Sequence, residues 1–394
     1  MTDIQKENKS GGKVPNLRFP SFEGEWEVKK LGEIAEKIGD GLHGTPSYTD
    51  ESNYYFINGN NLINGKIEIT ENTKKIDAKT FLKNDKNLRK NTLLISINGT
   101  IGNIAKYNNE NVMLGKSVGY FNFEENSDFL YFVLQTSPVQ EHFKSELTGS
   151  TIKNLSLKTL RETNLRLPSQ DEQQKVASFL SLIDERITTQ SKIINDLKTL
   201  KTATAKKIFS QELRFKDDKG NEFLEWENIL LGDTLDYEQP TNYLVSSTEY
   251  DDSFETPVVT AGKTFILGYT DDKNGVFEKE KLPVIIFDDF TTASQFVDFP
   301  FKAKSSAMKI LKVKNDTNIR FIFEALQMIN YEVGGHGRHW ISVFSNLSIF
   351  VPSFPEQTKI ANFLSAIDSK IDMENQLLQK LEEQKKYLLQ NMFV

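Results

Sequence analysis

The sequence predicts an α+β protein in which two mixed α/β domains are separated by two long helices that pair as an antiparallel coiled coil. Three observations lead to this fold class: an internal repeat, two long segments with heptad-like apolar spacing, and two variable blocks with strand-like runs. The chain of 394 residues has room for about two to three domains. The repeat relates its two halves by a pseudo-two-fold symmetry.

The internal repeat is clearest in two segments that lie at a constant offset of 184 positions. Residues 168–187 and 352–371 share 12 of 20 amino acids, and the register continues without a gap to Phe209 and Phe393. A second match relates the leading segments, since Leu17-Arg18-Phe19, Trp26 and Leu31-Gly32 resemble Leu213-Arg214-Phe215, Trp226 and Leu231-Gly232. Each half therefore consists of a short leading segment, a variable block and a helical segment.

Both helical segments begin with the residues that favour a helix start. Pro168 and Pro352 precede first turns that carry Asp171, Glu172 and Glu356, which suit the positive end of the helix dipole. Beyond these turns, no Gly or Pro interrupts the chain up to position 212 or position 394. Forty helical residues rise about 60 Å.

An apolar stripe with spacings of three and four residues runs along each helical segment, so we expect the two helices to pack against each other. Polar residues occupy equivalent places in the two stripes, Gln190 with Glu374 and Lys201 with Lys385, and should fix the register. The alternative is that each stripe packs only on its own domain. The residues expected to pair the helices are Val176, Leu180, Ile183, Ile187, Ile194, Leu197, Ile360, Leu364, Ile367, Ile371, Leu378 and Leu381.

The variable blocks, about residues 39–165 and 233–350, read as mixed α+β domains that align poorly with each other. Strand-like runs lie at 93–97, 284–287 and 307–313, short helical patterns lie at 127–134 and 319–331, and Asn-Gly pairs at 58, 64, 98 and 274 indicate turns. The expected boundaries are a flexible tail at 1–16, a domain at 17–168, a helix at 169–212, a domain at 213–352 and a helix at 353–394.

Composition excludes several classes of protein. The chain has no cysteine, which removes thiol catalysis, disulfides and Cys-ligated clusters. Its first residues lack the basic and apolar regions of a secretory signal, and no apolar run approaches the ~18 residues of a membrane span. Four scattered histidines do not indicate a zinc site. We therefore expect a cytoplasmic protein with no membrane association and with no metal or cofactor of its own.

Motifs that could carry catalysis are weak. Gly115-Lys116-Ser117 and Gly262-Lys263-Thr264 look like the ends of phosphate loops, but Glu110 and Pro257 stand where such loops need glycine. Asp288-Asp289 follows an apolar run and leaves open a metal-dependent nuclease or nucleotidyl enzyme, although no matching Glu-x-Lys follows. The other interpretation of this pair is a turn at the end of a strand.

Charge is distributed unevenly. The formal net charge is −7, yet residues 74–90 hold seven Lys and Arg, and residues 302–314 hold five Lys and no acid. Basic segments attract phosphates, whereas polar and aromatic side chains on loops can read base edges. Candidate loops lie at residues 43–48, 98–100, 149–153, 291–292 and 337–340.

The repeated pattern Pro-x-x-x-Glu-Gln-x-Lys-[Val/Ile]-Ala-x-Phe-Leu-Ser-x-Ile-Asp, followed each time by a long helix, resembles the conserved regions of the specificity subunit of bacterial type I restriction–modification enzymes. Gly39-Asp40-Gly41-x-His43-Gly44-Thr45-Pro46 and Gly99-Thr100-Ile101-Gly102 resemble elements of its target-recognition domains. The resemblance covers the chain after residue 16. The second block departs from it, because Phe287-Asp288-Asp289-Phe290-Thr291-Thr292 stands near the place comparable to Gly-Thr-Ile-Gly.

The resemblance implies a non-catalytic subunit of a methyltransferase/endonuclease complex, in which each target-recognition domain reads one half of a split site in double-stranded DNA and the helices space the two domains. Two modification subunits, which bind S-adenosylmethionine and methylate adenine, dock on it, and two restriction/translocase subunits that use ATP and Mg can join. A coiled-coil adaptor without DNA specificity is a further alternative. The residues expected to contact DNA are His43, Thr45, Tyr48, Asn98, Thr100, Lys116, Ser150, Thr151, Lys153, Lys263, Thr291, Thr292, Lys304, Arg338, His339 and Trp340.

Overall fold

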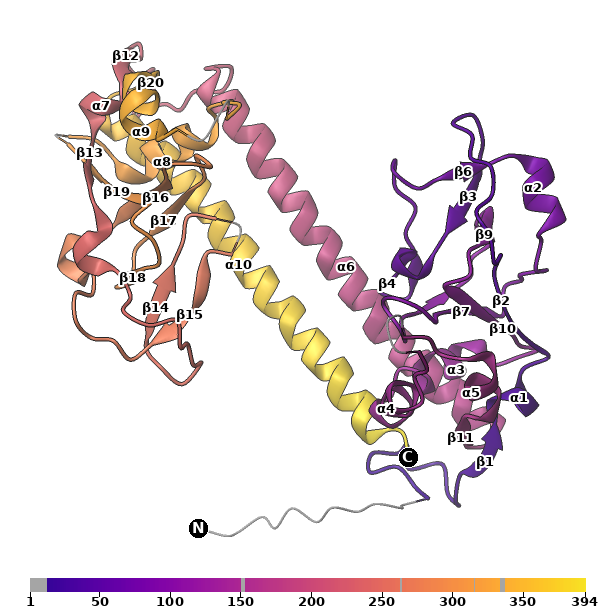
Figure 1. Cartoon of the computed structure of the whole chain (residues 1–394). Coiled ribbons are helices and arrows are strands. Elements are labelled where there is room, and N and C mark those ends of the chain that lie inside the picture. The colour runs from indigo at the N-terminus through magenta and orange to yellow at the C-terminus, as the bar shows by residue number, and fades with distance from the viewer. Residues whose placement is uncertain (1–12, 150–152, 263, 315, 334–336) are drawn as a thin grey trace, which may run out of the picture. The chain divides into compact units, whose positions relative to one another are not determined.

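The computed structural model describes residues 13–149, 153–262, 264–314, 316–333 and 337–394, and the chain divides into two compact units. Unit 1 comprises residues 1–191 and 376–394, and unit 2 comprises residues 192–375. Two long helices, α6 (Gln170–Phe209) and α10 (Phe354–Asn391), each contribute one part to each unit (Figure 1). The sequence predicts both helices, and their observed ends lie a few residues from the predicted ends at 169, 212, 353 and 394.

The sheets of unit 1 are small and mostly antiparallel. The central one has the order β2-β10-β7-β8, and a second sheet has the order β6-β3-β9, in which β3 and β9 are parallel. Two-stranded sheets join β1 to β11 and β4 to β5. The strands are β1 (Glu27–Lys30), β2 (Lys37–Asp40), β3 (Tyr54–Ile57), β4 (Leu62–Ile63), β5 (Lys66–Ile67), β6 (Lys75–Ile76), β7 (Thr92–Ser96), β8 (Ile104–Lys106), β9 (Val112–Leu114), β10 (Val118–Asn122) and β11 (Asn164–Leu167).

Short helices connect these strands, and α3 and α5 pack against the central sheet of unit 1. Helix α3 carries a run of large apolar side chains, and Phe129, Leu130 and Phe132 are buried in the main core of this unit. The helices are α1 (Leu31–Ile34), α2 (Ala78–Lys83), α3 (Ser127–Val133), α4 (Ser137–Ser145) and α5 (Leu157–Glu162), with a 3-10 turn η1 (Gly59–Asn61).

Unit 2 contains a four-stranded sheet of order β13-β19-β16-β17, a three-stranded sheet of order β15-β14-β18, and the pair β12-β20. Its strands are β12 (Glu227–Leu230), β13 (Leu235–Glu238), β14 (Thr256–Val259), β15 (Ile266–Thr270), β16 (Val284–Asp288), β17 (Ser294–Val297), β18 (Lys302–Ala303), β19 (Met308–Val313) and β20 (Ser348–Val351). The shorter helices are α7 (Leu231–Thr234), α8 (Ile319–Gln327) and α9 (His339–Ser342), with 3-10 turns η2 (Pro240–Tyr243), η3 (Lys279–Lys281) and η4 (Phe344–Asn346).

The two units repeat one topology although their variable blocks have little sequence in common. The sheets β2-β10-β7-β8 and β13-β19-β16-β17 correspond strand for strand, and so do β6-β3-β9 and β15-β14-β18, including the parallel contacts β3–β9 and β14–β18. Strand pairing requires only apolar, extended segments in the right order, so the surface residues are free to diverge. The pseudo-two-fold repeat therefore extends into the blocks.

Local sequence explains the central strands and one hairpin. All five residues of β7 are buried, and the buried hydroxyl of Thr92 donates to Asn122 Oδ1 at 2.8 Å. Residues 284–287 of β16 are buried in the same way. Asn64 and Gly65 have positive φ angles of 49° and 79°, as the two-residue turn between β4 and β5 requires.

The long helices pack against each other in antiparallel directions within each unit. In unit 1, Val176, Leu180 and Ile183 of α6 join one core cluster with Leu388 of α10 and with Met392, which directly follows α10. In unit 2, Ile208 near the end of α6 joins a cluster that contains Ile360 and Leu364 from the start of α10. The predicted pairing of the helices is confirmed.

All twelve residues expected to pair the helices are buried or half-buried, and these clusters also contain side chains of the adjoining α/β domains. The stripes thus pack on the partner helix and on the domain together. In the described part of the chain, no helix is long and apolar enough to cross a membrane.

Candidate nucleic-acid interface

The loops that follow β2, β3, β7 and β9 meet at one end of the sheets of unit 1. Backbone N–H groups link them: Leu42 donates to Leu114 O at 2.7 Å, Gly115 to Ile57 O at 2.8 Å, and Ile97 to the carbonyl of Ser117 at 2.9 Å. A fifth loop joins through Leu155, whose N–H donates to Ile97 O at 2.9 Å. We call this set, residues 41–48, 58–61, 97–103, 115–117, 148–149 and 153–155, loop cluster 1.

Loop cluster 1 contains every described candidate from the first block. His43, Thr45 and Tyr48 are exposed on the loop after β2, and His43 Nε2 lies 2.6 Å from Asp40 Oδ2. Asn98 is half-buried on the loop after β7, where its backbone forms a bridge with Asn154. The structure therefore brings together residues that are distant in sequence.

Three further candidates of the first block lie in the same cluster. Thr100 is exposed, but its hydroxyl is engaged in a hydrogen bond to Gly59 O at 3.1 Å. Lys116 and Lys153 are exposed. Ser150 and Thr151 lie outside the described residues.

The equivalent end of unit 2 is built by the loops after β14, β16 and β18. Lys304 donates its N–H to Val259 O at 3.1 Å, and His339 donates its N–H to Asp289 O at 2.9 Å. We call residues 260–265, 289–293, 304–307 and 337–340 loop cluster 2, with position 263 outside the described residues. Lys304 follows β18 and Lys116 lies just beyond β9, so the two lysines occupy equivalent loops after the strands that run parallel to β14 and β3.

The candidates of the second block fall into two groups. Thr291 and Arg338 are exposed and Thr292 is half-buried with a positive φ of 60°, so all three can be reached at this end. His339 and Trp340 are 6% and 1% exposed, and Trp340 packs its ring against Phe287. Both rings form part of the core, where they support the loop. Lys263 lies outside the described residues.

The two basic segments, residues 74–90 and 302–314, differ in how far their Lys and Arg side chains are exposed. Residues 302–314 do not form a free basic surface: Lys302 and Lys309 are buried beside Asp272 and Asp289. Lys304, Lys312 and Lys314 are half-buried, Lys312 pairs with Glu238, and Lys314 pairs with Asp236 at 2.9 Å. A run of lysines in sequence can thus be neutralised by acids from neighbouring strands, which sequence order does not reveal.

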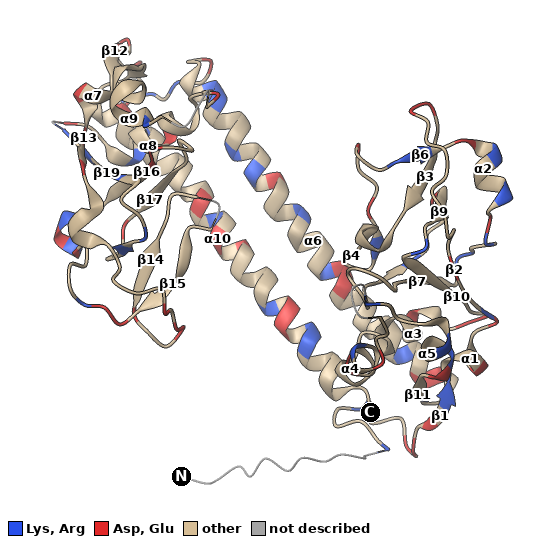
Figure 2. Ribbon diagram, in the orientation of Figure 1, with Lys and Arg blue, Asp and Glu red and all other residues tan. Residues whose placement is uncertain are grey.

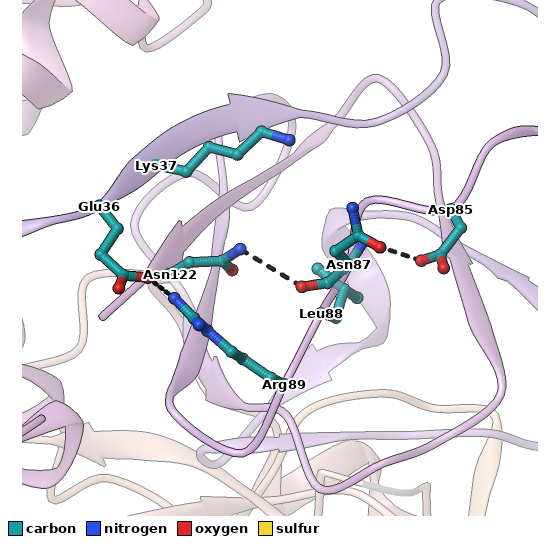
Figure 3. A pocket seen from close by; sticks show the side chains of 7 residues that line it. All are labelled: Glu36, Lys37, Asp85, Asn87, Leu88, Arg89 and Asn122. Carbon is teal, nitrogen blue, oxygen red and sulfur yellow. Dashed lines mark hydrogen bonds and ion pairs between the residues drawn. The ribbon is translucent and has the colours of Figure 1, made fainter. Parts of the chain in front are cut away.

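The first basic segment, in contrast, displays most of its charge. Lys74, Lys79, Lys83 and Lys90 are exposed, and helix α2 carries part of this charge (Figure 2). Arg89 forms an ion pair with Glu36 in a polar pocket of about 510 Å³ (Figure 3). This pocket lies where β2 begins and β10 ends, at the end of the sheet opposite to loop cluster 1.

Asp288 and Asp289, the two aspartates that were candidates for the active site of a metal-dependent nuclease, have local partners. Asp288 Oδ1 accepts the N–H groups of Phe290 and Thr291 at 2.9 and 2.7 Å, which is the bonding of a turn. Asp289 is buried, lies 3.3 Å from Lys309 Nζ, and accepts the N–H of Trp340 at 2.8 Å. No group of acids and histidines arranged to hold a metal occurs among the described residues.

An ion pair connects the two repeated sequence patterns in each unit, and sequence reasoning missed it. Arg18 donates to Glu172 at 2.7 Å, and Arg214 donates to Glu356 at 3.0 Å. Both glutamates are buried, and their hydrogen bonds raise the pKa of each arginine. The Glu of the repeated helix-start pattern thus holds the Leu-Arg-Phe segment, a pairing that the co-occurrence of the two patterns could have suggested.

Comparison with known proteins matches both halves of the chain to one family. Residues 23–199 and 224–383 match the family described as "Type I restriction modification DNA specificity domain". The chain is 49% identical over 133 residues to the specificity subunit of the Escherichia coli type I restriction enzyme EcoR124I/EcoR124II, which is 33% of this chain and 32% of that protein. It is 29% identical over 256 residues to the type I restriction enzyme MjaIX specificity subunit of Methanocaldococcus jannaschii, 59% of this chain and 54% of that protein.

These matches span about a third and about half of the two relatives. A likeness in fold extends further: the crystal structure of a type I restriction–modification S subunit from M. genitalium superimposes with a TM-score of 0.63 at 19% identity, covering 97% of this chain and 99% of that one. The family match covers most of the chain and both halves of its repeat. The chain therefore belongs to the DNA specificity subunits of type I restriction–modification systems.

Proposed function

We propose that each unit reads one half of a bipartite site in double-stranded DNA, through loop cluster 1 and loop cluster 2, and that the chain itself catalyses no reaction. The observation that carries this proposal is the repetition of one loop-bearing topology in two units whose loops differ in sequence. A shared frame with different loops is what two readers of different half-sites need, because base edges are read by side chains on surfaces that reach into a groove.

The proposed DNA contacts are the accessible candidates of the two clusters. Asn can read adenine edges and Lys or Arg can read guanine edges or bind phosphates. The exposed lysines at positions 74, 79 and 83 would add affinity that does not depend on sequence, whereas Lys90 precedes β7, at the opposite end of the sheet from loop cluster 1. The contacts are His43, Thr45, Tyr48, Asn98, Thr100, Lys116, Lys153, Thr291, Thr292, Lys304 and Arg338, together with Ser150, Thr151 and Lys263, whereas His339 and Trp340 act from within the core.

The helices α6 and α10 would fix the distance between the two half-sites and dock two modification subunits. Their outer faces carry exposed apolar side chains, among them Leu182 and Leu200 of α6 and Met373 and Leu377 of α10. Apolar side chains at the surface of a helix pair are typical of helix–helix docking. In unit 1, the end of α10 also borders a groove of about 1360 Å³ with the hairpin β4–β5.

S-adenosylmethionine, ATP and Mg would then be bound by the modification subunits and by restriction/translocase subunits, and this chain would supply sequence recognition alone. The test is methylation mapping of DNA treated with the complex of this chain and its modification subunits. We expect methylation at one split site with two fixed halves and a fixed gap. Methylation that is independent of sequence, or a single undivided site, would contradict the proposal.

A further inference from the structure

We propose that Asn58 and Ser117 are positioning residues of the first reader: they hold the loops of loop cluster 1 in register without contacting DNA themselves. The inference rests on the proposed function and deepens it, because it names the groups that orient the reading side chains. Neither residue was among the candidates from the sequence. Both are half-buried between the loops that carry those candidates.

The peptide groups on either side of Gly59 are held by side chains from two other loops. Its N–H donates to Ser117 Oγ at 2.9 Å, and its carbonyl oxygen accepts from Thr100 Oγ1 at 3.1 Å. The Ser117 hydroxyl donates in turn to Asn58 Oδ1 at 3.0 Å. The loops after β3, β7 and β9 are thereby joined at a single residue, and every bond in the chain of donors and acceptors is directional.

The lack of space around Gly59 and Gly115 supports this close approach of the loops independently. A Cβ atom on Gly115 would lie 2.4 Å from Asn58 Oδ1, and one on Gly59 would lie 2.4 Å from Ser96 Oγ. Contacts this short force the neighbouring group to move, so a larger residue at either position would displace the side chain of Asn58 or of Ser96. Close packing as well as hydrogen bonds therefore holds the loops after β3, β7 and β9 together.

These hydrogen bonds and contacts act directly on the residues that are proposed to read DNA. Lys116 precedes Ser117, and Asn98 and Thr100 lie on the loop whose Ile97 N–H donates to the Ser117 carbonyl. Discrimination between bases depends on donors and acceptors held at fixed positions, whereas attraction to phosphates tolerates movement. Loosening the loops should therefore reduce selectivity more than overall affinity.

Unit 2 offers a control serine in the loop that is equivalent to the loop of Ser117. Ser305, which is not a proposed DNA contact, lies in the loop after β18, and its Oγ accepts the N–H of Ala307 within its own loop at 3.1 Å. Thr260, in the loop equivalent to that of Asn58, likewise donates to Thr264 O in its own loop at 2.8 Å. Removing the Ser305 hydroxyl should leave both readers in place.

The experiment uses the full chain in complex with its modification subunits, and a library of duplex DNA in which both half-sites are randomised. The variants are Ser117→Ala, Asn58→Ala, the hydroxyl-retaining Ser117→Thr, and the control Ser305→Ala. We expect Ser117→Ala and Asn58→Ala to lower discrimination by about tenfold in one half-site, equal to the loss of one good base contact. The other half-site and the affinity for unrelated DNA should change by less than about twofold.

Ser117→Thr and Ser305→Ala should retain wild-type selectivity in both half-sites. Wild-type selectivity in Ser117→Ala and Asn58→Ala, or an equal loss in both half-sites, would overturn the inference. Asn58→Ala tests the same contact from the opposite loop if Ser117→Ala unfolds, which thermal melting monitors. A wild-type complex without sequence selectivity would instead overturn the proposed function, and this inference with it.

Discussion

Lys385 Nζ of α10 lies 2.7 Å from Asp184 Oδ1 of α6 in unit 1, and the internal repeat reproduces this ion pair in unit 2. There, Lys201 Nζ lies 2.8 Å from Asp368 Oδ2, and both members are offset by 184 positions from their counterparts. The two helices have exchanged donor and acceptor, as an antiparallel pair with a two-fold axis requires. The lysines expected to set the register of the helices thus have charged partners on the opposite helix.

Removing these ion pairs should affect the two units differently. In unit 2, Lys201 also contacts the buried Glu324 at 3.0 Å, and Arg320 pairs with Glu324 and with Asp368, so four charges form one network. We expect a coupling energy of about 1 kcal/mol for Asp184 and Lys385 in a double-mutant cycle, and a larger one for Lys201 and Glu324. Urea unfolding of the single and double variants measures both, and equal values would contradict the network.

Arg214→Met should destabilise the chain by about 3–5 kcal/mol, because it leaves the fully buried carboxylate of Glu356 without its cation. Trp226 Nε1 donates to the same carboxylate at 3.2 Å but supplies no charge. Lys216→Met is the control, since its pair with Glu222 is exposed on both sides and should contribute little to stability. Similar losses in denaturant unfolding for the two variants would refute the role of burial.

The sequence predicts the long helices and the central strands of this protein well, because these elements depend on patterns of neighbouring residues. Apolar spacing along α6 and α10 and the absence of Gly and Pro define the helices, and the repeat at a fixed offset defines their relationship. Strands β7, β16 and β19 follow from apolar runs. The Asn64-Gly65 turn follows from the requirement for positive φ.

The sequence predicts the site less well because the site depends on contacts between distant segments. Lysines at 302–314 look like a basic patch until Asp272 and Glu238 are brought beside them. Trp340 looks like an aromatic on a loop until it is seen buried against Phe287. In the sequence, Asn58 belongs to a turn signal and Ser117 to a motif that resembles the end of a phosphate loop, and only folding places them around one glycine.

Asp272 should contribute to stability in a pH-dependent manner. Hydrogen bonds from the buried Lys302 and from Ser246 lower the pKa of its carboxyl below the ordinary value of 3.8. A carboxyl with a lowered folded-state pKa stabilises fully above its unfolded pKa and loses this contribution as the pH falls towards the folded value. Asp272→Asn should therefore be less stable than wild type at pH 7, and the difference should shrink below about pH 4.

The comparison for this prediction is Asp298→Asn, which changes an exposed carboxyl in the same unit. Urea unfolding between pH 3 and pH 7 should give this variant a stability close to that of wild type throughout. A difference between Asp272→Asn and wild type that stays constant down to the lowest pH would show that the ion pair is not the source of the effect.

Arg338→Ala and Lys153→Ala should separate base contacts from phosphate contacts in the two clusters. Both side chains are exposed, on loops that the backbone ties to the ends of β16 and β7. Loss of a base contact should relax one position of one half-site at a cost of about 1–3 kcal/mol, whereas loss of a phosphate contact should weaken binding evenly and reduce its salt dependence. Binding titrations of the assembled complex at several salt concentrations distinguish these results, and unchanged affinity in both variants would remove these loops from the interface.

Deleting residues 191–197 and 375–381 together should shorten the gap between the two half-sites without changing either half. These segments are equivalent by the repeat offset, and their removal leaves the pairs Asp184–Lys385 and Lys201–Asp368 in matching register. Seven helical residues rise about 10.5 Å, which corresponds to about three base pairs of DNA. Deleting only residues 191–197 is the control, because it breaks the antiparallel register and should lower stability. Methylation mapping that finds the original gap after the double deletion would rule out the helices as the element that sets the spacing.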